Sequence, residues 1–190
     1  PPFFAVADGV GGGKAGELAS SQMLAWCRGI EPAVWRAPQR LAQRLREADA
    51  VLAGQLQALN PGGPSATTFA GAWLRPDGSG HIAHVGDVRI LHWRNTPDGV
   101  QVRPLTEDQT YAALGETPPP GGSPGDPARM VGVGAVGQPP VQAVALREGE
   151  GLMLCSDGFH RFMPTPGMLA LLAEPGLSLT RLAAALAHAA

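Results

Sequence analysis

The sequence has few cysteines, few charged residues and few aromatic residues. Of its 190 residues, 2 are cysteine, 16% are charged and 5% are aromatic, and the formal net charge is −2. Cys27 and Cys155 match neither a zinc-site spacing nor a CxxC pair, so nothing in the sequence calls for an oxidising compartment. The lack of a basic excess argues against binding to nucleic acid.

The sequence also lacks any apolar run approaching the roughly 18 residues of a membrane span. Its first residues, "PPFFAVADG", lack the basic and apolar regions of a signal peptide. We therefore expect a cytoplasmic protein with no membrane partner.

Glycine and proline, in contrast, are abundant. The 26 glycines and 19 prolines predict many turns and loops, which suits a compact enzyme better than a coiled coil or a disordered chain. The length fits one domain spanning residues 1–190. Residues 115–127 hold so many of both that we expect a mobile loop without regular structure.

Hydrophobic patterns predict a mixture of strands and helices. Leucine and alanine recur every three or four residues over 41–59, which is typical of an amphipathic helix, and 60–63 read as its stop. A helix is also expected over 17–27, Thr165 and Ser178 are candidate N-caps, and Leu179, Leu182 and Leu186 share one helix face. Short apolar runs predict strands at 3–7, 67–74, 81–85, 88–93, 100–104, 141–146 and 151–155, with the last two expected to pair. Strands grouped by hairpins between helices indicate an α+β fold.

A glycine-dense loop, "ADGVGGGKAG" at residues 7–16, raises the question of a nucleotide site. A Walker A loop would need a glycine at Asp8 and a hydroxyl at Ala15, so that motif fails. A GxGxxG pattern does occur at Gly11, Gly13 and Gly16. The segment that should carry the ribose-binding acid, "GIEPAVWRAPQ", does not read as a strand, so a dinucleotide site is a distant alternative.

Three Asp-Gly pairs follow apolar strands, at Asp8-Gly9, Gly86-Asp87 and Asp157-Gly158. A single pair would be an ordinary turn. Three in the same setting predict that the carboxylates gather at one rim, and clustered hard oxygen ligands suit Mg²⁺ or Mn²⁺.

Five segments in order resemble motifs of the metal-dependent protein serine/threonine phosphatases, the PPM or protein phosphatase 2C type, with the bacterial branch the better match. They are "FFAVADGVGGGKAGELAS", "SATTFAGAWL", "HIAHVGDVRILHW", "PLTEDQTYAALG" and "LREGEGLMLCSDGF". The resemblance implies two antiparallel sheets sandwiched between helices, with a dinuclear Mn²⁺ or Mg²⁺ centre between them. It also implies a flap over about 108–133.

The resemblance assigns roles to particular residues. Asp8 would bridge both metals, the Gly9 carbonyl would bind one, Asp157 would hold the first, and Asp87 would match the ligand of a weaker third ion. Asp8 and Asp157 would be catalytic through metal-activated water. The implied substrates are proteins carrying phosphoserine or phosphothreonine, made by a cognate kinase, and we expect a monomer.

The chain departs from the family at both ends. The family has an upstream Asn-Glu/Gln-Asp strand, a phosphate-binding arginine and a downstream Asp-Asn, and none of these lies within the 190 residues. The chain therefore looks truncated at both ends, and we expect it to bind metal weakly and turn over little by itself. The alternative is an inactive phosphatase-like module that binds phosphoproteins or regulates a partner.

Four other residues require interpretation. Cys155 has no nameable histidine partner and reads as a buried structural thiol. His160 could donate a proton to the leaving group but fits better as a surface residue at a helix start. Arg89 is expected to hold the Gly86-Asp87 corner by packing or by an ion pair, while a phosphate contact for Arg161 is an open alternative.

Overall fold

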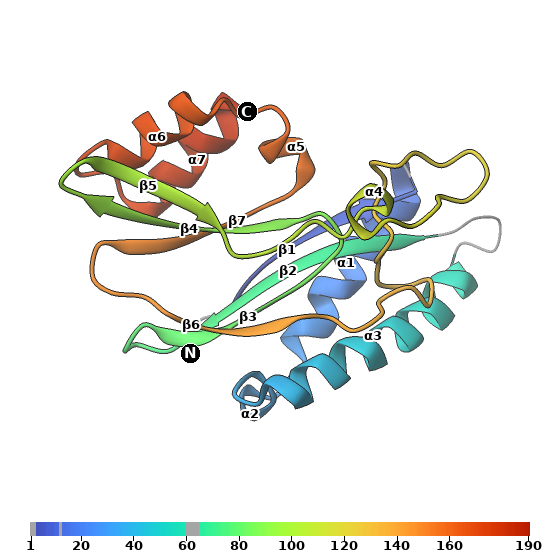
Figure 1. The fold of residues 1–190 in the computed structure, drawn as a ribbon. Coiled ribbons are helices and arrows are strands. Elements are labelled where there is room, and N and C mark those ends of the chain that lie inside the picture. The colour runs from blue at the N-terminus through green and yellow to red at the C-terminus, as the bar shows by residue number, and fades with distance from the viewer. Residues whose placement is uncertain (1–2, 12, 60–64) are drawn as a thin grey trace.

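The computed structural model describes residues 3–11, 13–59 and 65–190, which form two antiparallel sheets between helices (Figure 1). The first sheet has the order β1-β2-β3-β6 and the second β5-β4-β7. The strands of the first sheet are β1 (Phe3–Val10), β2 (Ala66–Leu74), β3 (Ser79–Val85) and β6 (Val141–Ala145); those of the second are β4 (Arg89–Thr96), β5 (Gly99–Pro104) and β7 (Glu150–Cys155). The predicted α+β class with two antiparallel sheets is confirmed.

Helices cover the outer face of each sheet (Figure 1). The first sheet carries α1 (Gly13–Arg28), α2 (Pro32–Trp35) and α3 (Pro38–Leu59); the second carries α5 (Asp157–His160), α6 (Thr165–Ala173) and α7 (Leu179–Ala189). The short α4 (Tyr111–Leu114) lies in the long connection between β5 and β6. No helix in the described part of the chain is both long and apolar enough to cross a membrane.

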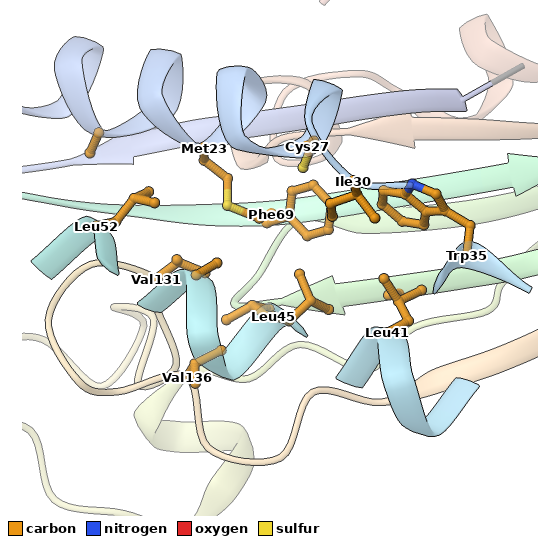
Figure 2. Packing of buried hydrophobic residues seen from close by; sticks show 14 of the residues in the cluster. Met23, Cys27, Ile30, Trp35, Leu41, Leu45, Leu52, Phe69, Val131 and Val136 are labelled. Atoms are coloured by element: carbon orange, nitrogen blue, oxygen red, sulfur yellow. The ribbon is translucent and has the colours of Figure 1, made fainter. Parts of the chain in front are cut away.

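The larger core lies between the first sheet and helices α1 and α3 (Figure 2). Leu41, Leu45 and Leu52 from α3 pack with Met23 of α1 and Phe69 of β2, all at most 1% exposed. Each such buried side chain contributes about 1.5–3 kcal/mol. The predicted amphipathic helix is therefore confirmed, although Leu59 at its end is 59% exposed and its predicted stop at 60–63 falls outside the described residues.

A second apolar layer lies between the two sheets and positions the candidate site. It contains Ala70 of β2 and Ile90 of β4. Val6 is paired with Ala70, and Asp8 is paired with Thr68 two residues along. Because side chains alternate along a strand, Asp8 lies on the face of β1 that looks toward the second sheet, at the end of this apolar row.

Two strand predictions are wrong. β6 and β7 do not pair with each other: β6 pairs with β3 in the first sheet and β7 with β4 in the second. A short turn between two apolar runs indicates a hairpin locally, but the segment 146–149 instead crosses between sheets. In addition, β1 continues to Val10, so Asp8 and Gly9 lie within a paired strand rather than in a loop.

The C-terminal helices follow the predicted caps only in part. Ser178 is the N-cap of α7, and its side chain accepts a hydrogen bond from the Arg181 amide. Thr165 is the first residue of α6 rather than its cap, since Pro164 occupies that position. Leu179 is 76% exposed, so only Leu182 and Leu186 of the predicted face are buried.

Residues 115–127 contain no helix or strand, as predicted, but hydrogen bonds tie them to α4. The amides of Tyr111 and Ala112 donate to the carbonyls of Asp126 and Pro124.

Candidate active site

The structure brings the three predicted aspartates together at one end of the sandwich. Asp8 comes from β1, Asp87 from the turn after β3, and Asp157 from the first position of α5 after β7. The Asp8 and Asp157 carboxyl groups are within hydrogen-bonding reach of each other. Arg161 connects the other pair, with 3.3 Å to an Asp87 carboxylate oxygen and 3.0 Å to one of Asp157.

The surroundings of Asp8 disfavour its ionised form. Burial raises its pKa above the usual 3.8, and the charge of Asp157 and the hydrogen bond with it raise the pKa further. A hydrogen bond from Ser156 and the charge of Arg161 act in the opposite direction. The two carboxyl groups are therefore most stable when they share a proton or a cation.

Asp87 is only 5% exposed, and burial followed by the charge of Asp157 raises its pKa. Its backbone carbonyl accepts a hydrogen bond of 2.9 Å from Nε2 of His160. His160 thus fixes the Asp87 turn from α5, which differs from both the surface role and the proton-donor role considered for it.

Two side chains from the segment after β5 hold the same turn. The Gln109 side-chain oxygen accepts from the Gly86 amide at 2.8 Å, and the Gln109 amide donates to the Gly86 carbonyl at 3.0 Å. Arg89 donates to both oxygens of Asp108, at 2.8 and 2.7 Å, and this contact lowers the pKa of Asp108. Arg89 thus forms an ion pair, one of the two roles expected for it, but its partner is Asp108 rather than the Gly86-Asp87 corner itself.

Gly9 and Gly16 allow helix α1 to pack closely on β1. A Cβ on Gly9 would lie 2.0 Å from the carbonyl oxygen of Gly16 in α1, so glycine is required where the helix crosses β1. Thr67 donates a hydrogen bond to the neighbouring Asp8 carbonyl at 2.9 Å.

The residues present fit a divalent cation in part. Among the described residues, no group of three or more histidine, cysteine, aspartate or glutamate side chains is arranged to hold a metal ion. Asp8 and Asp157 nevertheless form a pair of close carboxylates with raised proton affinity on Asp8, which a hard cation would relieve. Arg161 supplies a counter-charge to both Asp87 and Asp157, and it is the one ion-pair partner that the described residues give Asp87.

Comparisons with known proteins identify related folds. No protein-family model and no curated protein matches the sequence, but solved structures do. A bacterial serine phosphatase superposes with a TM-score of 0.80 at 22% identity, covering 98% of this chain and 78% of that one. Stp1 from Staphylococcus aureus gives 0.77 at 22% identity (98% and 77% covered), and the catalytic domain of the phosphatase PstP in complex with two manganese ions gives 0.72 at 22% (98% and 81%).

The chain has the fold of the bacterial serine/threonine phosphatases. The resemblance predicted from the five motifs is thus confirmed at the level of the fold. One of these similar structures holds two manganese ions.

Beside the aspartates, this phosphatase fold has a groove that the sequence did not reveal. Its volume is about 990 Å³, and it lies between edge strand β5 and helix α6. Val102, Met163 and Met168 line it, and Asp108 and His160 reach its lining from the side of the aspartate cluster. Since β5 and α6 are about 60 residues apart, only tertiary packing creates the groove.

Asp49 is a second residue whose role the sequence analysis missed. It lies on the buried face of α3, 4% exposed, and its carboxylate accepts hydrogen bonds from four backbone amides. The donors are Gly132, Val133, Gly134 and Val136. The only signal in the sequence is an acidic residue four positions after the core residue Leu45, within the apolar stripe.

The two cysteines are buried thiols. Burial raises the pKa of Cys155 to about 11 and that of Cys27 to about 12. Neither supplies a thiolate near neutral pH, so the structural role predicted for Cys155 is supported.

Proposed function

We propose that this protein is a metal-dependent phosphatase that removes phosphate from phosphoserine and phosphothreonine in proteins. The observation that carries the proposal is the close Asp8–Asp157 carboxylate pair, set at the end of the inter-sheet core in a chain with this fold. Asp8, Asp157 and the Gly9 carbonyl would hold two Mn²⁺ or Mg²⁺ ions. When bound, such ions activate a water molecule and polarise the phosphoryl group.

The chain's own residues organise the site around that chemistry. Asp8 and Asp157 concentrate negative charge where cations are needed, and β1 and α5 hold them on two separately packed elements. The hydrogen bond from His160 to the Asp87 carbonyl and the two bonds between Gln109 and Gly86 keep the turn after β3 in place. We assign His160 a positioning role, because its Nε2 is already engaged.

The groove between β5 and α6 gives the substrate polypeptide room beside the phosphorylated residue. Its lining combines apolar side chains such as Met163 and Met168, which adapt to different sequences, with polar and charged ones such as Arg103. We propose that the phosphoprotein lies along this groove, with the flap at 108–133 on the other side of the site. A cognate kinase, a cytoplasmic location and a monomeric state belong to the same proposal.

One observation favours a second candidate, a non-catalytic phosphoprotein-binding module. Arg161 neutralises part of the carboxylate cluster, as a protein without metal would require. A module of this kind would bind phosphopeptides without hydrolysing them.

Hydrolysis of p-nitrophenyl phosphate tests the choice between the two. We expect turnover that is low for these 190 residues by themselves, requires Mn²⁺ and stops with a chelator. It should fall by at least about 100-fold in Asp8→Asn and Asp157→Asn, because each change removes a metal ligand. The control Asp98→Asn changes an exposed carboxylate outside the site. Phosphopeptide binding without any hydrolysis would favour the module, and metal-independent hydrolysis by both site variants would contradict the two-metal proposal.

A further inference from the structure

Arg161 links three segments at the aspartate cluster. Its guanidinium lies 3.3 Å from the Asp87 carboxylate, 3.0 Å from that of Asp157 and 3.4 Å from the Gly125 carbonyl in the loop after α4. Arg161 follows α5 directly, so the helix that begins at Asp157 also presents this cation one turn later, at i+4.

Asp87 needs a counter-charge at this position. Its side chain is 7% exposed, and burial and the neighbouring Asp157 both disfavour its ionised form. An unpaired buried carboxylate is costly, so such groups are normally paired with a cation.

Within the described part of the chain, Arg161 is the only residue that forms an ion pair with Asp87. Arg89 is bound to Asp108 instead, and His160 contacts the Asp87 backbone carbonyl rather than its carboxylate. The counter-charge is therefore the guanidinium.

We propose that Arg161 is a built-in cation that occupies the space between Asp87 and Asp157, so that no third divalent ion binds there. The inference rests on the proposed function and revises the third, weaker metal site expected at Asp87. A guanidinium is charged at every accessible pH, and its planar donors already use oxygens of both carboxylates. A divalent ion at Asp87 would have to displace it and would meet its repulsion.

Counting bound Mn²⁺ per chain tests this inference without reference to activity. The comparison uses equilibrium dialysis of wild type, Arg161→Met, Arg161→Lys and the control Arg181→Met, which removes an exposed arginine of α7. We expect Arg161→Met to bind one additional Mn²⁺, at least about tenfold more tightly than any such site in wild type. Arg161→Lys and the control Arg181→Met should bind no additional Mn²⁺. The added ion should disappear in Arg161→Met combined with Asp87→Asn.

The possible outcomes separate the two proposals. Equal Mn²⁺ stoichiometry and affinity in wild type and Arg161→Met would overturn the role of Arg161. A wild type that neither binds Mn²⁺ nor hydrolyses p-nitrophenyl phosphate would overturn the proposed function, while an Asp87-dependent ion gained by Arg161→Met would still support this inference. Should Arg161→Met fail to fold, Arg161→Gln removes the charge and keeps a donor for Asp157.

Discussion

Replacing Asp8 by asparagine should stabilise the metal-free protein while removing its response to metal. In the metal-free state Asp8 faces the Asp157 carboxylate, and its pKa is raised by burial and by that neighbour. Because the pKa of Asp8 is higher in the folded protein than in the unfolded chain, Asp8 costs no stability below pH 3.8, the pKa in the unfolded chain. The free energy of unfolding falls as pH rises through the pKa of the folded protein. Asparagine removes this penalty, can donate to Asp157 and can still accept from Ser156.

The size of the effect follows from the geometry. Two unit charges about 4 Å apart interact by roughly 4 kcal/mol at an effective dielectric constant of about 20. Solvent reaches much of this pair, and the charge of Arg161 opposes the repulsion. We therefore expect the repulsion between Asp8 and Asp157 to lower the stability of the protein by about 1 kcal/mol. For a chain of this size, 1 kcal/mol corresponds to a rise in Tm of about 2–4 °C.

Mn²⁺ should reverse the order of the two proteins. An ion at 100 times its Kd stabilises the wild type by about 2.7 kcal/mol, and Asp8→Asn, lacking a ligand, should gain little. Thermal unfolding at neutral pH, with chelator and then with Mn²⁺, measures both effects, and Asp98→Asn controls for loss of one negative charge at an exposed position. A metal-free Asp8→Asn protein less stable than wild type at neutral pH, or equal stabilisation of both by Mn²⁺, would refute the reasoning.

Three further predictions concern packing and hydrogen bonds, each measured by denaturant unfolding. Gly9→Ala should lower the free energy of unfolding by about 3 kcal/mol or more, because the new Cβ would lie 2.0 Å from a backbone carbonyl oxygen. The control Gly54→Ala, which has open space in α3, should raise it by up to about 1 kcal/mol. Equal effects of the two changes would contradict the close approach at Gly9. Asp49→Ala should cost about 3 kcal/mol or more by leaving buried amides without an acceptor, and a loss below 1 kcal/mol would contradict that role. Arg89→Met should cost less than about 1 kcal/mol at neutral pH, and the difference should vanish as pH falls through the lowered pKa of Asp108; a difference that grows in acid would contradict the ion pair.

The sequence was sufficient to predict that the three aspartates lie together, because their signal is local. Asp87 and Asp157 each follow an apolar strand and adjoin a glycine, and the structure places both at strand ends on the same side of the sandwich. Asp8 fits the pattern less well, since its strand continues past it. The local sequence showed that β1 is apolar, but it did not show that the pairing with β2 continues to Val10.

Sheet membership and counter-charges were not predictable in the same way. The 141–146 and 151–155 runs look alike in sequence, yet β6 joins the first sheet and β7 the second because each adds to a different free edge. The contact of Arg161 with Asp157 is local, at i+4, but its contact with Asp87 gave no signal because the two residues are 74 positions apart. Asp49 was hidden for a similar reason, because its amide donors come from the loop before β6.

The position of the aspartate cluster explains why the folded protein keeps Asp8 and Asp157 together although their repulsion lowers its stability. The apolar layer between the sheets, including Ala70 and Ile90, is set by packing that does not depend on the carboxylates. β1 and β7 are held in place by their neighbours in the two sheets, so Asp8 and Asp157 are brought together despite their repulsion. The repulsion between the two carboxylates lowers the stability of the metal-free protein, and a bound cation would remove this repulsion and so bind more tightly. On this reasoning, neutralising Asp8 removes the repulsion and raises stability, whereas neutralising Arg161 adds to the charge that a cation must balance.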